Sequence, residues 1–223
     1  MTEKSESLVG KLSVCYDGHP TLKALLQLIP SWGVASELIQ SRADEIKRDR
    51  LRVFFDELAA GETELNTELI NNSDFLHCFF RASEAAVRSR QSEKIKLFAK
   101  MLCASLGDAS EHTLDEYEEL LDVLQEISYR EFSVLNALRK FEMKYANHEF
   151  DNDVVRINAY WENFKKNVCN RYEIAEDEFL PFMERLERTG LYWRNTGSFY
   201  GLRIGKTTPQ FAKLCRYVSR KGP

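Results

Sequence analysis

Two helix-start signals in close succession constrain the fold of this chain more than any other feature. Thr113 and Glu116 have the spacing of a capping box, and Ser128 and Glu131 repeat that spacing shortly afterwards. In a capping box these side chains satisfy backbone N–H groups at the start of a helix. The sequence therefore predicts one helix that ends near residue 127 and another that starts at once, and this junction divides the chain into two parts.

Apolar residues follow both signals at intervals of three and four, the period of a helix with one buried face. The expected buried residues are Tyr117, Leu120, Leu121 and Leu124 in the first helix and Val134, Leu135, Leu138 and Phe141 in the second. The same period predicts three earlier helices. One is a long amphipathic helix that ends at Gly61, with Ile46, Leu51, Phe54, Phe55 and Leu58 on its apolar face. The next opens at Ser73 and Asp74 and breaks near residues 89–92, and the third covers Glu93–Leu106.

The charge of the chain differs between these two parts. Residues 1–127 contain 14 Lys+Arg and 23 Asp+Glu, a net charge of -9, whereas residues 128–223 contain 17 and 12, a net charge of +5. A basic end is typical of a nucleic-acid or anionic-membrane partner, and it also complements an acidic front half. Both explanations stay open at this point.

Segment 21–39 is the most apolar part of the chain, and Pro30 and Gly33 predict that it breaks into two short helices. The first interpretation is a buried helical corner. The alternative is a segment that binds a membrane or a partner, because a tryptophan flanked by aliphatic residues suits an interface. The candidate residues for that role are Leu25, Leu28, Ile29 and Trp32.

The second part predicts three further helices and a hairpin. A third helix is capped by Asp151 or Asn152, with Val154, Ile157, Trp161, Phe164 and Val168 inward, and a short turn covers 170–174. A fourth helix carries Phe179, Phe182, Met183 and Leu186 on one face. Two strand-like runs, Leu191–Arg194 and Phe199–Ile204, flank turn residues 195–198. Thr208 and Pro209 then open a final helix, with Phe211, Leu214, Cys215 and Val218 inward.

This order of elements, with Gly190 at the turn from helix into strand, resembles the winged helix-turn-helix superfamily. The expected fold is mainly α, with a flexible N-terminus over 1–20, a helical domain over 21–127 and a winged-helix-like domain with a two-stranded wing over 128–223. Pro181 departs from the pattern and predicts a late start or a kink in the fourth helix.

In that superfamily the fourth helix would meet base edges with its first residues, which here are Glu176, Asp177 and Glu178, with Glu184 further along. Carboxylates repel a phosphate-lined groove, so we do not expect this helix to read DNA. Basic residues lie on the wing and the last helix instead. The candidate nucleic-acid-binding residues are Arg194, Arg203, Lys206, Lys213 and Arg216. The alternative is that these charges are solvated or pair with the acidic front half.

Catalytic patterns are weak. Residues 201–207 resemble a phosphate-binding loop that is one spacer residue short. The histidines are scattered, and no metal-ligand spacing is present. His77 beside Cys78 is better explained as a partly buried histidine and a core cysteine, because adjacent helical side chains diverge. The five separated cysteines suit a reducing cytoplasm. We expect no catalytic residue, metal, cofactor or small-molecule substrate.

The front half also resembles Abi-alpha-type bacterial proteins associated with abortive infection, through Glu93-Lys94-Ile95, Phe98-Ala99 and Ile127-Ser128, and Thr208 and Phe211 after the wing add to the likeness. The resemblance implies a role in phage defence. We expect a non-enzymatic, cytoplasmic bacterial or phage protein that binds a protein partner or itself. The alternatives are a DNA-associated regulator that uses the wing and a membrane-acting effector that uses segment 21–39. Glu3, Lys4 and Glu6 precede any apolar run, which is not the pattern of a signal peptide.

Overall fold

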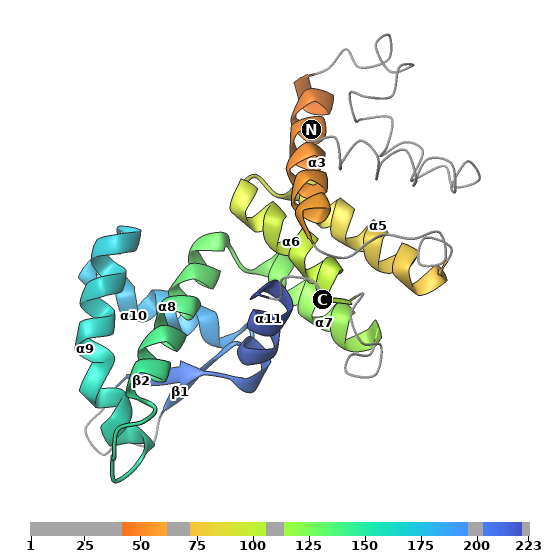
Figure 1. Cartoon of the computed structure of the whole chain (residues 1–223). Coiled ribbons are helices and arrows are strands. Elements are labelled where there is room, and N and C mark those ends of the chain that lie inside the picture. The colour runs from red at the N-terminus through yellow and green to blue at the C-terminus, as the bar shows by residue number, and fades with distance from the viewer. Residues whose placement is uncertain (1–41, 62–71, 106–113, 196–202, 220–223) are drawn as a thin grey trace, which may run out of the picture. The chain divides into compact units, whose positions relative to one another are not determined.

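The structure is a computed structural model that describes residues 42–61, 72–105, 114–195 and 203–219. Those residues are mainly helical and contain one two-stranded antiparallel sheet, as the sequence predicts (Figure 1). The elements are α3 (Arg42–Ala60), α5 (Ser73–Arg88), α6 (Ser92–Ser105), α7 (Leu114–Glu126), α8 (Tyr129–Tyr145), α9 (Asp153–Tyr172), α10 (Glu176–Glu187), β1 (Tyr192–Asn195), β2 (Ile204–Thr207) and α11 (Pro209–Ser219).

The chain divides into two compact units. The first unit contains the described residues of 1–125 and 217–223, and the second contains those of 126–216. The division falls inside α11, so the last described residues of that helix belong to the first unit.

In the first unit α3, α5 and α6 pack on one another, with α6 against both of the others (Figure 1). The aromatic side chains of α3 and α5 meet in the core, where the Phe79 ring lies 6.3 Å from Phe54 and 6.0 Å from Phe55. Leu51, Phe54, Phe55 and Leu58 are buried as predicted. Ile46 is not, because 43% of its surface is exposed. The apolar face of α3 therefore starts later than the sequence pattern indicates.

Local signals set the helix boundaries of α5 and α6. Asn72, one residue before the predicted start, caps α5 by accepting the N–H groups of Asp74 and Phe75. After α5 the backbone of Ser89 has an extended conformation, which ends the helix. Helix α6 begins at Ser92, one residue earlier than predicted.

Helix α7 carries the predicted stripe, and Tyr117, Leu120, Leu121 and Leu124 are all buried. Thr113, its predicted cap, lies outside the described residues. The Tyr117 ring contacts the ring of Tyr217, with centroids 6.5 Å apart. Burial raises the pKa of the Tyr117 hydroxyl well above its ordinary value, so this side chain is a neutral core residue.

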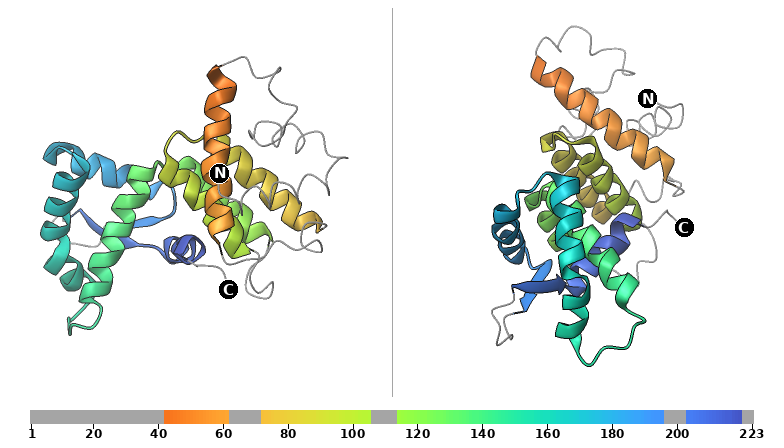
Figure 2. Two further views of the ribbon diagram at one scale, coloured as in Figure 1. Left: turned by 45° about the horizontal axis from the view of Figure 1, so that its top comes forward. Right: turned by 90° about the vertical axis from the view of Figure 1, so that its left-hand side faces the viewer.

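The second unit begins with the capping box predicted for α8. Ser128 accepts the N–H of Glu131, and the Glu131 carboxylate accepts the N–H of Ser128 at 2.7 Å. Helix α8 packs along α9, and the two helices lie side by side in both views of Figure 2. The Phe141 ring bridges them, 5.9 Å from the ring of Phe164. Phe141 is half-buried, whereas the other predicted core residues of α8 are fully buried.

The connection from α9 to α10 differs from the prediction in two ways. Asn152 caps α9 as expected, but the helix continues through Tyr172 where a turn was predicted from residue 170. Arg130 of α8 donates to the carbonyl oxygens of Tyr172 at 2.6 Å and Glu173 at 2.9 Å, which stabilises this extra helical turn. Helix α10 begins at Glu176 and runs through Pro181, so the late start predicted from that proline is wrong.

Strands β1 and β2 pair antiparallel, with Trp193 opposite Lys206 and Arg194 opposite Gly205. The first strand matches the prediction within a residue. The second begins at Ile204, where the predicted strand was to end, and residues 196–202 lie outside the described residues. Gly190, with φ +70°, turns the chain from α10 into β1, as the sequence indicates.

Thr208 caps α11, since its hydroxyl oxygen accepts the N–H of Phe211 at 3.2 Å. Phe211, Leu214 and Val218 are buried as predicted, and Cys215 is half-buried. Within the described ranges, no helix has the length and apolar character that a membrane crossing requires. Segment 21–39 lies outside those ranges.

Candidate functional site

The predicted basic residues of the wing are engaged by carboxylates of their own unit. Arg194 on β1 donates from Nη1 to Glu184 Oε1 at 3.0 Å, and its Nε lies 3.5 Å from Glu187 Oε2. Arg203 Nη1 lies 3.4 Å from the same oxygen of Glu184. Two guanidinium groups of the hairpin thus share one carboxylate of α10.

Lys206 on β2 makes a separate pair of contacts. Its Nζ lies 2.7 Å from Asp153 Oδ2 at the start of α9 and 5.2 Å from the centre of the Trp193 ring. The hydrogen bond from Lys206 lowers the pKa of Asp153 below its ordinary value of 3.8, so this carboxyl stays ionised at neutral pH. Trp193 keeps 61% of its surface exposed, with the lysine ammonium against its ring.

The structure therefore brings three of the five candidate nucleic-acid-binding residues to the hairpin and gives each a carboxylate partner. Lys213 and Arg216 lie exposed on α11. The sequence left two explanations of the wing cations open, contact with nucleic acid and solvation or pairing with the acidic front half, and it did not identify Glu184, Glu187 and Asp153 as their partners. The three-residue spacing of Glu184 and Glu187 on one side of α10 was the available signal.

The first turn of α10 is acidic and exposed. Glu176, Asp177 and Glu178 all face solvent, and Lys165 Nζ lies 3.5 Å from Glu176 Oε2. Ala175 is the N-cap residue of α10, and its methyl side chain cannot accept the free backbone N–H groups at this end of the helix. The exposed first turn of α10 is thus negatively charged.

The described part of the stretch that resembles a phosphate-binding loop, residues 203–207, runs into a paired strand. Gly205, Lys206 and Thr207 belong to β2 and are paired with β1. The backbone N–H of Thr207 is donated to Glu142 Oε1 at 2.6 Å. A phosphate loop needs several free amides that converge on one point, and this strand does not supply them.

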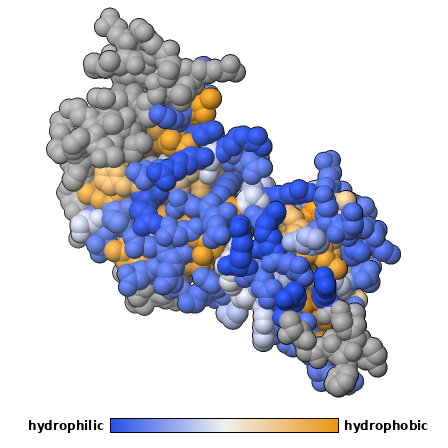
Figure 3. Space-filling model, turned by 180° about the vertical axis from the view of Figure 1, so that it is seen from behind, coloured by the Kyte–Doolittle hydropathy of each residue, from blue (hydrophilic) through white to orange (hydrophobic). Residues whose placement is uncertain are grey.

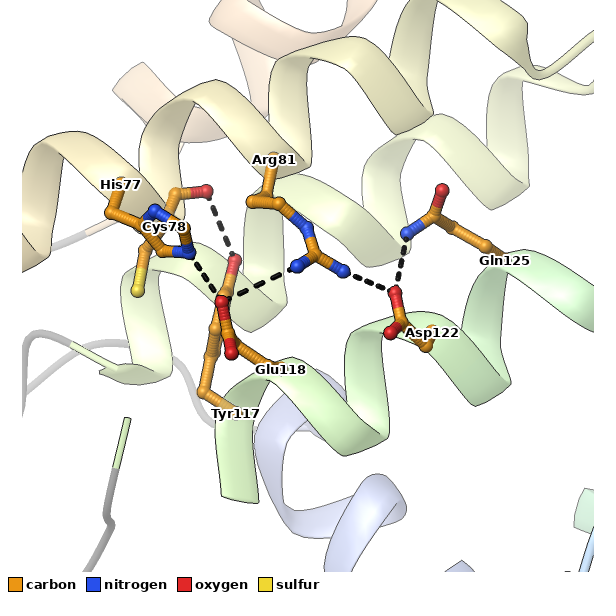
Figure 4. Close-up of polar contacts among 7 residues, drawn as sticks. All are labelled: His77, Cys78, Arg81, Tyr117, Glu118, Asp122 and Gln125. Carbon is orange, nitrogen blue, oxygen red and sulfur yellow. Dashed lines mark hydrogen bonds and ion pairs between the residues drawn. The ribbon is translucent and has the colours of Figure 1, made fainter. Parts of the chain in front are cut away.

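A second polar cluster joins α5 and α7 in the first unit, and the sequence analysis missed it. In Figure 4 the side chains of His77 and Arg81 on α5 point towards Glu118 and Asp122 on α7. Arg81 Nη1 lies 3.3 Å from Glu118 Oε1, and Gln125 Nε2 donates to Asp122 at 3.3 Å. Each helix contributes two residues at a spacing of four, which places them on one face.

Cys78, the neighbour of His77, is a core residue. Burial raises the pKa of its thiol to about 12, and the Tyr117 hydroxyl donates to its carbonyl oxygen at 3.4 Å. His77 is more exposed than predicted, with 47% of its side chain accessible, because it lies at the rim of the α5–α7 contact. The thiolate that a nucleophile requires is absent at neutral pH.

Among the described residues, no three His, Cys, Asp or Glu side chains are placed to hold a metal ion. Hydrophilic side chains cover most of the described surface on the face drawn in Figure 3, and apolar side chains show there only in small groups. The membrane or partner candidates Leu25, Leu28, Ile29 and Trp32 lie outside the described residues.

Comparison with known proteins transfers no function to this chain. No protein-family model matches the chain, and no curated protein or solved structure matches it either. What the chain does must therefore be inferred from its own side chains.

Proposed function

We propose that the second unit is a winged-helix-like module that docks another protein, and that the chain is not an enzyme. The order of α8, α9, α10, hairpin and α11 supports this proposal, because the winged-helix superfamily has three helices followed by a β-hairpin wing. The left-handed turn at Gly190 between α10 and β1 supports it as well. The surface charge of α10 favours a protein partner over a nucleic acid.

The observation that carries the choice of partner is the exposed acidic turn of Glu176, Asp177 and Glu178. Nucleic-acid binding gains most of its affinity from cations that replace counterions at the phosphates. Three carboxylates at the start of the would-be recognition helix oppose that gain. A protein partner carries both signs of charge, and it can complement an acidic helix end.

The second candidate function is sequence-independent duplex binding through the wing. It is favoured by Arg203, whose side chain is 60% exposed at the end of the hairpin. Against it, Arg194, Arg203 and Lys206 already contact carboxylates, so a duplex would have to displace Glu184 and Asp153. Each displaced ion pair reduces the electrostatic gain from the phosphates.

The proposal that the chain is not an enzyme is supported by the raised pKa values of three of its described thiols and by the contact of His77. Burial raises the pKa of the thiols of Cys103 and Cys215 to about 11 and that of Cys78 to about 12. The histidine nearest to a cysteine, His77, contacts Glu118 and not a thiol. The proposed setting in phage defence rests on the sequence resemblance to Abi-alpha-type proteins.

Titration of a fluorescent random-sequence duplex against the full chain tests the choice of partner. We expect no binding in about 0.15 M salt and no difference between the natural chain and the Arg194→Glu/Lys206→Glu double variant. Salt-sensitive binding that disappears in the double variant would replace the proposal with duplex binding.

A photo-crosslinking residue at position 193, expressed in the native host, tests the positive claim. We expect a discrete crosslinked protein from position 193 and none from Glu162, an exposed control position on α9. Equal crosslinking from both positions would overturn docking at the hairpin.

A further inference from the structure

Arg194 and Arg203 on the hairpin share one carboxylate, that of Glu184. Glu184 offers a single oxygen, Oε1, to both Arg194 and Arg203, at 3.0 Å and 3.4 Å. The Nε of Arg194 is buried and has no hydrogen-bond partner within the part of the chain that the structure describes, and Glu187 Oε2 lies 3.5 Å from it. Among the described residues, Glu184 thus meets each of the two guanidinium groups with the same single oxygen.

Guanidinium groups bind carboxylates best through two parallel N–H···O bonds to both oxygens. Neither arginine here has that geometry with Glu184. Arg203, with 60% of its side chain exposed, can also be reached by an outside group. An incoming carboxylate would satisfy donors that Glu184 leaves open, and it would release Glu184 to solvent.

We propose that the Arg194–Arg203 pair is the docking site for an acidic segment of the protein partner, and that Glu184 is an internal competitor for that site. The proposal rests on the proposed function, because it names the chemistry of the partner that the hairpin module binds. Glu184 then lowers the affinity of the arginines for the acidic segment. It pairs with both arginines until a carboxylate that binds them more tightly replaces it.

The surroundings of the pair favour a protein carboxylate over a polynucleotide. The carboxylate of Glu187 lies beside Arg194. The carboxylate of Asp153, at the start of α9, contacts Lys206 on β2. A continuous row of phosphates would meet these carboxylates along with the arginines. A single glutamate or aspartate side chain has to fit only between Arg194 and Arg203.

The test measures binding of a fluorescein-labelled peptide of about ten residues, in which glutamates are separated by neutral residues, to the full chain by fluorescence anisotropy at low salt. Glu184→Gln keeps the size of the side chain and removes its charge. We expect it to tighten peptide binding by about threefold to tenfold, the scale of one partly exposed ion pair. Arg203→Gln should weaken binding by a similar factor, because it removes one of the two guanidinium groups.

Glu126 and Arg188 provide the matched control, since they form a single ion pair at 3.6 Å in the same unit with about half of each side chain exposed. Glu126→Gln and Arg188→Gln change the net charge equally and should leave peptide affinity within twofold of the natural chain. The inference would be overturned if Glu126→Gln and Arg188→Gln changed peptide affinity as much as Glu184→Gln and Arg203→Gln do. It would also be overturned if no variant bound the peptide.

Two further outcomes separate this inference from the proposed function. A discrete crosslink from position 193 together with no response to Glu184→Gln overturns the internal competitor and leaves protein docking standing. Preference for a duplex over the peptide at equal charge, enhanced by Glu184→Gln, overturns both. Urea unfolding of Glu184→Gln checks that the variant remains folded in these comparisons.

Discussion

Glu142 on α8 ties down the last residue of β2: its carboxylate accepts the backbone N–H of Thr207 at 2.6 Å and the hydroxyl of the same residue through its second oxygen. Thr207 lies opposite Tyr192 at the end of the ladder, where the strand would otherwise fray. Hydrogen bonds to a charged acceptor contribute about 1.5–3 kcal/mol each when well formed.

We therefore expect Glu142→Ala to destabilise the second unit by about 1–2 kcal/mol and to speed hydrogen exchange at the Thr207 amide. Glu149→Ala, at an exposed position in the following loop, should change neither property. Unchanged protection of the Thr207 amide in Glu142→Ala would contradict this role of the carboxylate.

Gly205 is required by close packing within the hairpin. A Cβ at this position would lie 2.5 Å from the backbone carbonyl oxygen of Trp193 and would also collide with the Tyr192 ring. Because the carbonyl cannot move without distorting the ladder, Gly205→Ala should cost about 1–3 kcal/mol. Gly190→Ala should cost less, about 1 kcal/mol, since its penalty comes from the positive φ. Urea unfolding of the two variants gives the comparison, and the reverse order would contradict it.

Acid sensitivity of the second unit is expected from Glu131, which is buried in the capping box. Burial raises its pKa, but hydrogen bonds from Ser128 and Arg185 outweigh that effect, and the pKa falls below its ordinary value of 4.5. A lowered pKa contributes stability that is present above about pH 4.5 and is lost as the pH falls through the folded-state pKa. Glu131→Gln should thus be less stable at pH 7, while the difference from the natural chain narrows in acid.

Urea unfolding at several pH values between 7 and 3 measures that difference. Glu162→Gln, an exposed substitution on α9, is the control and should follow the natural chain at every pH. If the difference in unfolding free energy between Glu131→Gln and the natural chain stays constant over this pH range, the charge of the Glu131 carboxylate does not contribute to stability.

Arg81 holds α7 against α5 through its contacts with Glu118 and Asp122. These side chains are partly exposed, so the cost of Arg81→Ala should be modest, about 0.5–1 kcal/mol. Salt screens such pairs, and the cost should shrink in about 1 M NaCl. Thermal unfolding of Arg81→Ala and of the exposed α5 control Glu84→Ala, at low and high salt, tests this. A salt-independent loss would indicate packing by the arginine stem instead.

Thiol reactivity should follow burial. Cys78 and Cys103 are buried, and burial raises the pKa of their thiols to about 12 and about 11, so few thiolates form at neutral pH. Cys169 and Cys215 are both half-buried, but burial raises the pKa of the Cys215 thiol to about 11, so Cys169 should react with iodoacetamide first among the described cysteines. Mass spectrometry of protein alkylated at pH 7.5, with and without urea, checks the order. Rapid labelling of Cys78 in the folded chain would contradict its assignment as a core residue.

Local signals made several elements predictable. The capping box of Ser128 and Glu131 was identified correctly, and the cap of α9 was narrowed to Asp151 or Asn152, because the partners of a cap lie within three residues. The stripe of α7 and the turn at Gly190 followed from helical period and from the conformational freedom of glycine. The end of α9 was missed because Arg130, distant in the chain, holds the carbonyl of Tyr172.

The residues of the candidate site were only partly predictable from the sequence. The sequence identified the basic residues Arg194, Arg203 and Lys206, but packing alone selected Glu184 and Asp153 as their partners. The contact of His77 with Glu118 was hidden for the same reason, because 41 residues separate them.

The amino-acid sequence by itself determined where most helices begin and which face of each is apolar, since capping and periodicity act over three or four residues. Only the tertiary structure decided which charges meet. Ion pairs between distant residues depend on how the helices and the hairpin pack, and no local pattern carries that information.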